Sequence, residues 1–382
     1  MDVNFFLPTK IKMQDGLRHQ SGKLLNENSF NRVLIITDKG IVNAGLLEDI
    51  YRSLQKYNIF YKQFDHILPN PRDIDCDHIG TQFKDKQFDS ILAIGGGSVI
   101  DTAKAVSILL TNGGMVKDYE GLSVADKDPL PIVCIPTTAG TGSEVTFWSI
   151  ISDTKNNYKM AIGDPRIIPE MALLDPYFTA TLPKPIAAGT GMDALTHAIE
   201  AYTCKVANPI TDALALHAIK MIKENIIAAV DEKNEQAREH MLIGSLIAGA
   251  AFGNSDTAGV HCVSEAVGGI YDTPHGITNA IFLPLLFQYN ISANIEKHAE
   301  VAYALGVDRS VSKQQAASDA VDILFDLNKR LEIPTFREID NINPKDFTRI
   351  AELSVQSTSN PSNAREMNKA DYIEILNLAY NE

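Results

Sequence analysis

The sequence predicts an α/β dinucleotide-binding domain over residues 1–180 followed by an all-helical domain over residues 181–382. Three observations support this division. Short β-branched runs alternate with helix-spaced apolar residues in the first half, and a glycine-rich segment follows the third such run. Beyond Pro183, apolar residues recur at helical spacing to the end of the chain, and 382 residues are enough for two domains and a large core.

The first half alternates in the order expected of parallel strands joined by helical crossovers. Residues 33–37 form a β-branched strand that ends at Asp38, and residues 44–56 have the apolar spacing of a helix. A strand, a loop, a helix and a third strand then follow, at residues 59–64, 69–72, 74–83 and 90–94. Such sheets bind ligands beyond the carboxyl ends of their strands.

The segment GGGSVIDTAK, residues 95–104, lies directly after the third strand. Its three glycines let the backbone approach a ligand, and we expect Ser98 to cap a helix whose N-terminus favours a phosphate. These are features of a dinucleotide loop, although the GxGxxG spacing is absent. A turn needed only for strand-to-helix packing is the alternative. Asp38 is placed to hydrogen-bond a ribose 2'-hydroxyl and to repel a 2'-phosphate, which favours NAD over NADP.

A second polar loop, PTTAGTGSE at residues 136–144, follows a strand at residues 132–135. Hydroxyls interleaved with glycines would surround an anionic or polar ligand with donors. A flexible surface loop is the alternative, but apolar flanks on both sides argue against free exposure. Further strands are expected at residues 147–151, 158–162 and 171–174.

The helical half contains residues suited to a metal. In GTGMDALTHAIEAY, residues 189–202, the glycines and threonine at the start suggest a tight turn, and a helix follows. On that helix Asp193 and His197 lie one turn apart on one face. With His261 and His275, fourteen positions apart, they would form a site for Fe(II) or Zn(II). A chance helix pair, a core histidine and a turn residue or helix cap are the structural alternatives. Other helices are expected at residues 212–230, 236–251, 295–305, 312–331 and 372–380.

The composition is that of an ordinary soluble protein. The net charge of -14 is spread without acidic blocks, which argues against nucleic acid and anionic membranes as partners. The N-terminal MDVNFFLPTKIKM lacks a basic region followed by an apolar core, so no signal peptide is expected. The apolar run at residues 242–253 is too short to cross a bilayer and predicts a buried helix. Four scattered cysteines without CxxC spacing predict reduced thiols and a cytoplasmic location.

Together these motifs resemble the iron-containing (group III) alcohol dehydrogenase family, whose fold is like that of dehydroquinate synthase and glycerol dehydrogenase. The resemblance covers nearly the whole chain. It is carried by GGGSVIDTAK at 95–104, PTTAGTGSEVT at 136–146, ALLDP at 172–176, GMDALTHAIEAY at 191–202, AGAAFGN at 248–254 and TPHG at 273–276. It implies a dehydroquinate synthase-like fold and an enzyme that moves a hydride between NAD(H) and a small primary alcohol or aldehyde. It also favours Fe(II) over Zn(II), and a homodimer or larger homo-oligomer.

The resemblance also implies the site residues. The metal ligands would be Asp193, His197, His261 and His275. Contacts to the dinucleotide would come from Asp38, Asn70, Gly96, Gly97, Ser98, Asp101, Thr137, Thr138, Thr141 and Lys159. Substrate-pocket side chains would be Trp148, Phe252 and Thr257. Because Trp148 is large, we expect it to shorten the pocket and to select a small aldehyde.

One position departs from the family. Many members carry a further histidine four residues after the third ligand, where this chain has Glu265. On a helix Glu265 would face the same way as His261, as a proton acceptor, a polar contact to substrate, or a carboxylate that orients a ligand histidine. A solvated glutamate is the structural alternative. The proton route is therefore open between Glu265 and the ribose hydroxyls of the cofactor.

Two rival functions use the same features. A dehydroquinate synthase-like or glycerol dehydrogenase-like enzyme would share the scaffold, but a synthase would need basic side chains gathered around a substrate phosphate, and no such cluster lies near the ligands in sequence. A non-catalytic protein that binds NAD and metal is the second rival, and the intact ligand set argues against it.

Overall fold

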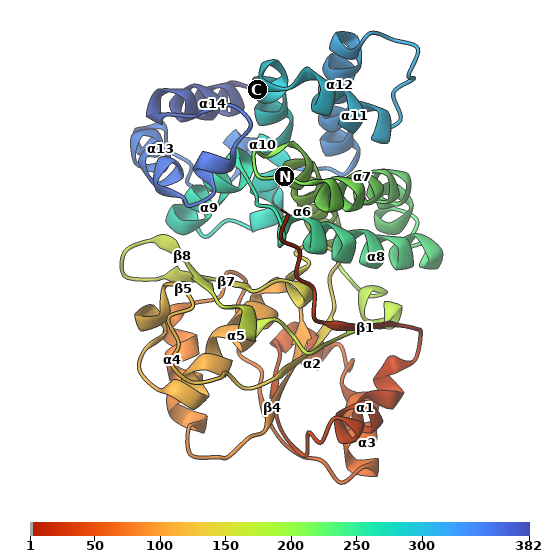
Figure 1. Cartoon of the computed structure of the whole chain (residues 1–382), viewed down its shortest axis with the longest axis vertical. Helices are drawn as coiled ribbons and strands as arrows, with labels where there is room; N and C mark the ends of the chain where they lie inside the picture. Colours follow the sequence, from red (N-terminus) through yellow and green to blue (C-terminus); the bar gives the residue numbers. More distant parts are fainter. Residues whose placement is uncertain (1–2) are drawn as a thin grey trace. The chain divides into compact units, whose positions relative to one another are not determined.

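The chain folds into two compact units, one of mixed α/β structure and one helical (Figure 1). The computed structural model describes residues 3–382, so the first two residues of the N-terminal segment lie outside it. The α/β unit contains Leu7–Thr138 and Ser143–Leu182. The helical unit contains Pro183–Glu382, Ala139–Gly142 and residues 3–6. The sequence pattern does not indicate that these last two short segments belong to the helical unit.

A six-stranded parallel sheet forms the centre of the α/β unit. Its order is β1-β9-β6-β4-β2-β3, and every pairing is parallel. The strands are β1 Lys10–Met13, β2 Arg32–Ile36, β3 Phe60–Phe64, β4 Ser90–Gly95, β6 Ile132–Pro136 and β9 Met171–Leu174. This sheet confirms the predicted α/β fold. The edge strand β1 was not predicted, because its sequence KIKM is short, basic and mostly exposed.

Alternate side chains of the central strands enter two separate cores. Leu34 and Ile36 of β2 pack with α4 (Asp73–Phe83) and α5 (Gly97–Asn112), whereas Val33 and Ile35 pack with α1 (Ser21–Glu27) and α3 (Glu48–Lys56). Figure 1 shows these two pairs of helices on opposite sides of β4. Burial of both faces explains why the strands read as continuous apolar runs in the sequence.

The predicted helix at residues 44–56 begins later than expected. The short helix α2 (Lys39–Asn43) ends before Gly45, whose φ of 68° places it in the left-handed region. The longer helix α3 then starts at Glu48. Leu46 and Leu47, which fall within the predicted helix, are buried in the turn between the two helices.

A second, smaller sheet has the order β5-β8-β7. Its strands are β5 Gly121–Leu122, β7 Trp148–Asp153 and β8 Tyr158–Gly163. Two of them correspond to strands predicted at residues 147–151 and 158–162. They pair with each other in antiparallel fashion and do not join the parallel sheet, and Trp148 lies opposite Gly163.

The helical unit is built around α6, which packs against α7, α8 and α10 (Figure 1). Its helices confirm the helical character predicted for the second half. They are α6 Lys184–Thr203, α7 Pro209–Val230, α8 Glu235–Phe252, α9 Gly259–Tyr271, α10 His275–Asn290, α11 Ile295–Ala304, α12 Lys313–Arg330, α13 Phe347–Gln356 and α14 Lys369–Asn381. None of the helices within residues 3–382 is both long and apolar enough to cross a membrane.

The tight turn expected at residues 189–191 is wrong, because these residues lie inside α6. Their glycines serve helix packing instead. A Cβ at Gly191 would lie 2.8 Å from Ile226 Cδ1 of α7, and a Cβ at Gly189 would lie 3.1 Å from Ile277 Cδ1 of α10. The absence of side chains therefore lets neighbouring helices approach α6 closely.

Candidate metal centre and dinucleotide-binding loops

One face of α6 carries three buried polar side chains. Asp193, His197 and Glu200 follow one another at helical spacing, and they are only 2%, 5% and 4% exposed. Buried charged and polar groups need partners, because leaving them unpaired in an apolar interior costs several kcal/mol, roughly 2–7 for a neutral polar group. Each of the three is therefore informative about what this part of the helical unit binds.

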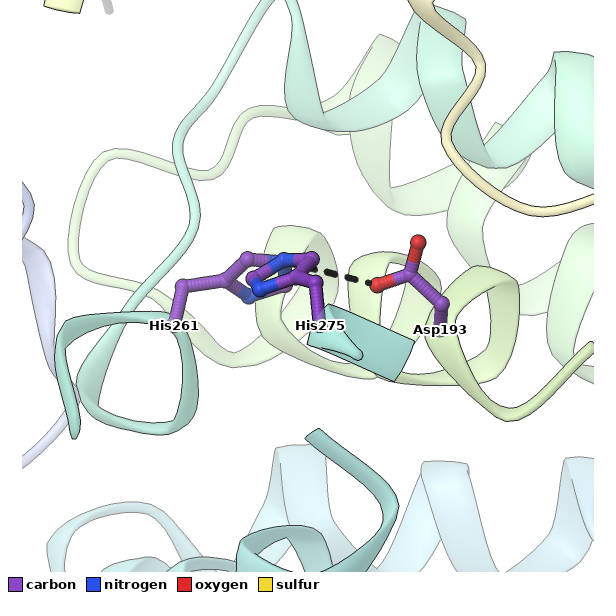
Figure 2. A group of neighbouring side chains, drawn as sticks. All are labelled: Asp193, His261 and His275. Carbon is purple, nitrogen blue, oxygen red and sulfur yellow. Dashed lines mark ion pairs between the residues drawn. The ribbon is translucent and has the colours of Figure 1, made fainter. Parts of the chain in front are cut away.

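Asp193 meets two histidines from other helices. His261 lies in the first turn of α9 and His275 is the first residue of α10. One potential ligand atom from each of the three residues lies within 4.8 Å of the other two. Asp193 Oδ1 is 3.9 Å from His261 Nε2 and 3.7 Å from His275 Nε2, and Figure 2 shows both rings beside the carboxylate. The structure thus brings together three residues that are distant in the sequence.

Asn279, one turn after His275, places its amide nitrogen among these three atoms. Its Nδ2 is 2.7 Å from Asp193 Oδ1, 3.2 Å from His261 Nε2 and 3.0 Å from His275 Nε2. An NH₂ group is a donor with two hydrogens, and the carboxylate and the two imidazoles around it can present lone pairs to them. A neutral donor surrounded by a carboxylate and two imidazoles occupies a position that also suits a cation, and the group therefore fits a metal ion. The sequence analysis missed Asn279, although its spacing from His275 repeats that of Asp193 and His197.

His197 lies beside this group and not within the three-residue cluster. Its Nδ1 is 3.8 Å from Asp193 Oδ1, and its ring centroid is 4.5 Å from that of His261. Its other face stacks on Phe252 at 4.2 Å. Within residues 3–382, His197 Nδ1 is buried without a hydrogen-bond partner. Such an orphaned acceptor or donor is costly, which is consistent with a role for His197 in binding.

The protonation states suit a metal. Burial lowers the pKa of His197 and of His261 to about 4, against the opposing effect of the Asp193 charge, so both rings are neutral at neutral pH. Burial alone would raise the pKa of Asp193, but His197, the two other histidines and the amide of Asn279 lower it overall. The carboxylate of Asp193 therefore lies beside two neutral imidazoles, those of His197 and His261, and these are the protonation states that metal binding requires.

Glu200 contacts His261 directly. Its Oε2 is 2.6 Å from His261 Nδ1, and burial raises the pKa of Glu200 to about 7. The sequence analysis did not single out Glu200. It considered Glu265 as one carboxylate that could orient a ligand histidine, and Glu200 makes such a contact with His261. Glu265 is partly buried on α9, one turn after His261.

The three proposed pocket residues lie in different surroundings. Phe252 is the last residue of α8 and stacks on His197, next to the metal-ligand cluster. Thr257 precedes α9, and its hydroxyl donates to Ser359 Oγ at 3.2 Å. Trp148 begins β7 in the α/β unit and packs over Gly163, where a built Cβ would lie 2.4 Å from the indole.

The dinucleotide candidates of the α/β unit cluster at the carboxyl ends of three neighbouring strands. Asp38 follows β2, the glycine segment follows β4, and Thr137 and Thr138 follow β6. Gly96 packs on Thr138, because a Cβ at Gly96 would lie 3.1 Å from the Thr138 side chain. Asp38 caps α2 by accepting from Ile41 N at 3.0 Å. The edge of the sheet therefore places the two polar loops side by side.

The expectation that Ser98 caps the following helix is wrong. Helix α5 begins at Gly97, its N-cap is Gly96, and no side chain caps it. Ser98 is the second residue of the helix, and its carbonyl accepts from Thr102. An uncapped N-terminus formed by two glycines leaves the first N–H groups of α5 for another acceptor.

Other predicted contacts are engaged within the protein. Asp101 accepts from Ser143 Oγ at 2.6 Å and from Ile150 N at 3.1 Å. Lys159 Nζ donates to Asn70 Oδ1 at 2.9 Å, and Asn70 has a φ of 57°. Thr141 lies in the short segment that belongs to the helical unit.

A fully buried lysine organises the second polar loop. Lys104 Nζ donates to Ser143 Oγ at 2.7 Å, Thr146 Oγ1 at 3.1 Å and the Trp148 carbonyl at 2.7 Å. It lies 3.9 Å from Asp101, so the buried charge is partly balanced. The sequence analysis quoted Lys104 within its motif but assigned it no role. Helix α5 therefore begins at the glycine segment and also carries Lys104, which anchors Ser143 of the second polar loop.

The fold and the site define a class of protein. One unit has a parallel sheet with an open helix N-terminus beyond β4, and the other has a buried carboxylate–imidazole cluster on a helical scaffold. These features are typical of a metal-dependent oxidoreductase that uses a dinucleotide.

Family models assign the chain within that class. Residues 8–176 match the model for iron-containing alcohol dehydrogenases, and residues 187–380 match the C-terminal model of the Fe-containing alcohol dehydrogenase family. The chain belongs to the iron-containing alcohol dehydrogenase family. The resemblance stated from the sequence motifs is thereby confirmed, and so is the fold class.

Individual relatives agree with this assignment. The NAD-dependent methanol dehydrogenase of Bacillus methanolicus is 35% identical over 376 residues, which cover 98% of this chain and 99% of that protein. The 1,3-propanediol dehydrogenase of Citrobacter freundii is 36% identical over 383 residues, covering 99% and 97%. A crystal structure of 1,3-propanediol oxidoreductase has a TM-score of 0.95 at 34% identity, covering 99% of this chain and 100% of that one. The protein is accordingly a metal-dependent alcohol dehydrogenase or aldehyde reductase.

Proposed function

We propose that the enzyme interconverts a small primary alcohol and its aldehyde, with NAD(H) as the hydride carrier and one divalent ion held by Asp193, His197, His261 and His275. The observation that carries the proposal is the position of the Asn279 amide nitrogen within hydrogen-bond distance of Asp193, His261 and His275. A bound cation explains why a buried carboxylate, a buried imidazole and a half-buried imidazole lie together in the helical unit.

Iron is our preferred metal. The cluster offers one carboxylate and imidazoles and contains no thiolate, and imidazole alone suits both iron and zinc. The absence of sulfur and the family favour Fe(II), with Zn(II) as the alternative. When bound, the metal supplies Lewis acidity that lowers the pKa of the alcohol and polarises the aldehyde carbonyl. The protein side chains hold it and keep its surroundings poor in water.

We place the dinucleotide at the carboxyl ends of β2, β4 and β6. The open N-terminus of α5 suits a phosphate, and the Asp38 carboxylate disfavours a 2'-phosphate, so NAD is preferred to NADP. When bound, the dinucleotide supplies the hydride acceptor or donor. The contacts we propose are those of Asp38, Asn70, Gly96, Gly97, Ser98, Asp101, Thr137, Thr138, Thr141 and Lys159. Of these, Asp101 acts through the loop it holds, since its carboxylate already accepts from Ser143 and Ile150.

The substrate is small. Two relatives are named for methanol and 1,3-propanediol, which are short alcohols, and Trp148 places a large ring at the start of β7. Phe252 and Thr257 are the other pocket residues in this proposal. The proton released on oxidation leaves through Glu265 or through the ribose hydroxyls of the cofactor. We further propose a cytoplasmic homodimer or larger homo-oligomer, which agrees with four free cysteines that are all buried.

The test uses enzyme purified without air and assayed for NADH and NADPH oxidation with short aldehydes. Activity should need Fe(II) or Zn(II), should fall at least a hundredfold in His261→Ala, and should be unchanged in His217→Ala, which removes an exposed histidine of α7. Elemental analysis of the same preparation identifies the metal. Full activity after removal of all metal, or equal activity of the two variants, would reject the proposal.

A further inference from the structure

We propose that Glu200 is the positioning residue of the metal centre: it fixes the tautomer of His261 and sets the first turn of α9 against α6. The proposal rests on the metal centre described above. Glu200 lies on α6, the helix that also carries Asp193 and His197. A single rigid element would therefore supply two ligands and the carboxylate that orients a third.

Both oxygens of Glu200 act as acceptors. Oε2 accepts from Ala258 N at 2.9 Å, and Oε1 accepts from Val260 N at 2.7 Å. Oε2 also lies 2.6 Å from His261 Nδ1. Backbone N–H groups can only donate, so the carboxylate already serves as an acceptor on both sides. An ionised Glu200 has no hydrogen to donate, so the shared hydrogen in the contact with His261 comes from the imidazole, which makes Nδ1 the protonated nitrogen.

The contact of the other ring nitrogen of His261, Nε2, agrees with a proton on Nδ1. His261 Nε2 lies 3.2 Å from the amide nitrogen of Asn279, which is itself 2.7 Å from the Asp193 carboxylate. That amide nitrogen is a donor, so this contact is a hydrogen bond when Nε2 offers a lone pair. A histidine that donates through Nδ1 and keeps Nε2 bare is in the form that binds a metal through Nε2.

Two side chains, those of Glu200 and Asn363, accept from the first N–H groups of α9. Of the two, Glu200 also hydrogen-bonds the ring of His261. The helix has no side-chain cap from its own N-cap residue, Ala258. Glu200 accepts from the N–H groups on either side of Gly259, and Gly259 N donates to Asn363 Oδ1 at 3.2 Å. Asn363 is buried like Glu200, and its side chain also hydrogen-bonds Asn290 and the Arg365 carbonyl, whereas its hydrogen bonds among residues 3–382 do not include His261. It provides the matched control for a role limited to helix capping.

Glutamine cannot replace Glu200 in this geometry. A carboxamide has one acceptor and one donor end, so in Glu200→Gln either the Val260 N–H or the shared Ala258 and His261 hydrogens would face an NH₂ group. The side chain keeps its size, and the ring of His261 loses its fixed tautomer. Loss of a hydrogen bond to a metal-ligating histidine typically weakens metal binding by about 10- to 100-fold.

The experiment measures Zn(II) affinity by competition with a chromophoric chelator for the wild type, Glu200→Gln and Asn363→Ala. We expect the affinity to fall by about 10- to 100-fold in Glu200→Gln. We expect it to stay at the wild-type value in Asn363→Ala, even though both variants melt at lower temperature. An equal loss in both variants would reduce Glu200 to a helix cap and overturn the proposal. Unchanged affinity in Glu200→Gln would do the same.

The tautomer is read in the wild type, independently of metal binding. Nitrogen-15 histidine spectra of the metal-free wild type should place the His261 proton on Nδ1, with the signal assigned by its loss in His261→Asn. A proton on Nε2 would overturn the proposal whatever the Zn(II) affinities of Glu200→Gln and Asn363→Ala. If the wild type binds no metal at all, the metal centre fails, whereas the tautomer still decides the role of Glu200.

Discussion

Gly276 lies directly against the backbone of Gly189: a Cβ built at Gly276 would be 2.3 Å from the Gly189 carbonyl oxygen. The same Cβ would be 3.3 Å from Asp193 Cβ. This close approach lets the first turn of α10 rest on α6 and leaves His275 Nε2 at 3.7 Å from Asp193 Oδ1. Two glycines far apart in the sequence thus set the spacing of two metal-binding candidates.

Gly276→Ala should therefore separate the two helices. The new Cβ would clash with a backbone oxygen, which cannot move away by changing a rotamer as a side chain can. We therefore expect a loss of about 1–3 kcal/mol in the free energy of unfolding. We also expect weaker Zn(II) binding, because His275 moves with α10. Urea unfolding and chelator competition measure the two effects. Gly244→Ala is the control, because its Cβ would meet only side chains, the nearest being Ile222 at 2.9 Å. Equal Zn(II) affinity in both variants would contradict this account.

The elements predicted well from the sequence were those whose pattern has a local physical cause. The strands β2 and β4 are buried on both faces, so their β-branched runs identify a parallel sheet. Asp193 and His197 stand four apart on α6, and helical geometry alone places them on one face. Long amphipathic helices such as α12 were found for the same reason.

The elements missed depend on contacts between distant segments. Gly189 and Gly191 read as turn residues because a single sequence does not reveal the helices that pack against them. Glu200 and Asn279 sit in ordinary helical patterns, and their partners come from α9, α6 and α10. The prediction that Ser98 caps α5 was wrong because the helix starts one residue earlier, at Gly97. The residue before it, Gly96, has no side chain and so allows the close approach of Thr138.

Asn279→Ala should change the stability of the metal-free protein more than that of the loaded protein. Removal of the amide takes a donor away from Asp193, His261 and the half-buried His275, at a cost of about 1–3 kcal/mol for each buried group left unsatisfied. A bound ion satisfies the same atoms. Melting by circular dichroism with a chelator and with Zn(II) should therefore show a larger metal-induced rise in the variant. In Asn328→Ala, which removes a donor to the Ala280 carbonyl, the metal-induced rise should match that of the wild type. The same rise in all three proteins would refute the role of Asn279.

Asp38→Asn should relax the choice of cofactor without loosening the fold. Asparagine can still accept from Ile41 N and cap α2, so the melting temperature should be unchanged. The lost negative charge no longer repels a 2'-phosphate, and we expect the ratio of kcat/KM for NADPH to that for NADH to rise by about tenfold, or about 1.4 kcal/mol. Asp38→Ala should show the same ratio and lose about 1 kcal/mol of stability with the cap. If the ratio of kcat/KM values is unchanged in both variants, Asp38 does not contact the ribose 2'-hydroxyl of the cofactor.

Trp148→Ala should widen the range of substrates toward longer alcohols. The indole packs on Gly163 and lies 5.1 Å from the ring of Phe147, whereas the Trp148 carbonyl, which accepts from Lys104, is retained in the variant. The variant should therefore keep the loop in place and lose only the bulk of the ring. Rates with a series of linear aldehydes measure the effect, and Trp148→Phe should give an intermediate profile. The same chain-length preference in all three proteins would count against Trp148 as a pocket residue.

Glu144→Gln should make stability less sensitive to pH. Burial raises the pKa of Glu144 to about 7 from its usual 4.5, although its own backbone N–H and the charge of Lys104 oppose this rise. A carboxyl whose pKa is raised on folding keeps its proton in the native state after the unfolded chain has lost it. Its stabilising contribution is therefore complete below pH 4.5 and is lost as the pH rises through 7.

The amide of Glu144→Gln does not titrate, so this loss disappears. A tenfold difference in proton affinity between the folded and unfolded chain corresponds to about 1.4 kcal/mol. Between about pH 4 and pH 8, the free energy of unfolding of the variant should therefore rise by up to about 3 kcal/mol relative to that of the wild type. Chemical denaturation at several pH values measures the difference. Glu170→Gln, an exposed position in the same unit, should follow the wild-type curve. If Glu144→Gln follows it too, Glu144 is ionised in the folded protein at neutral pH, and Lys104 outweighs the effect of its burial.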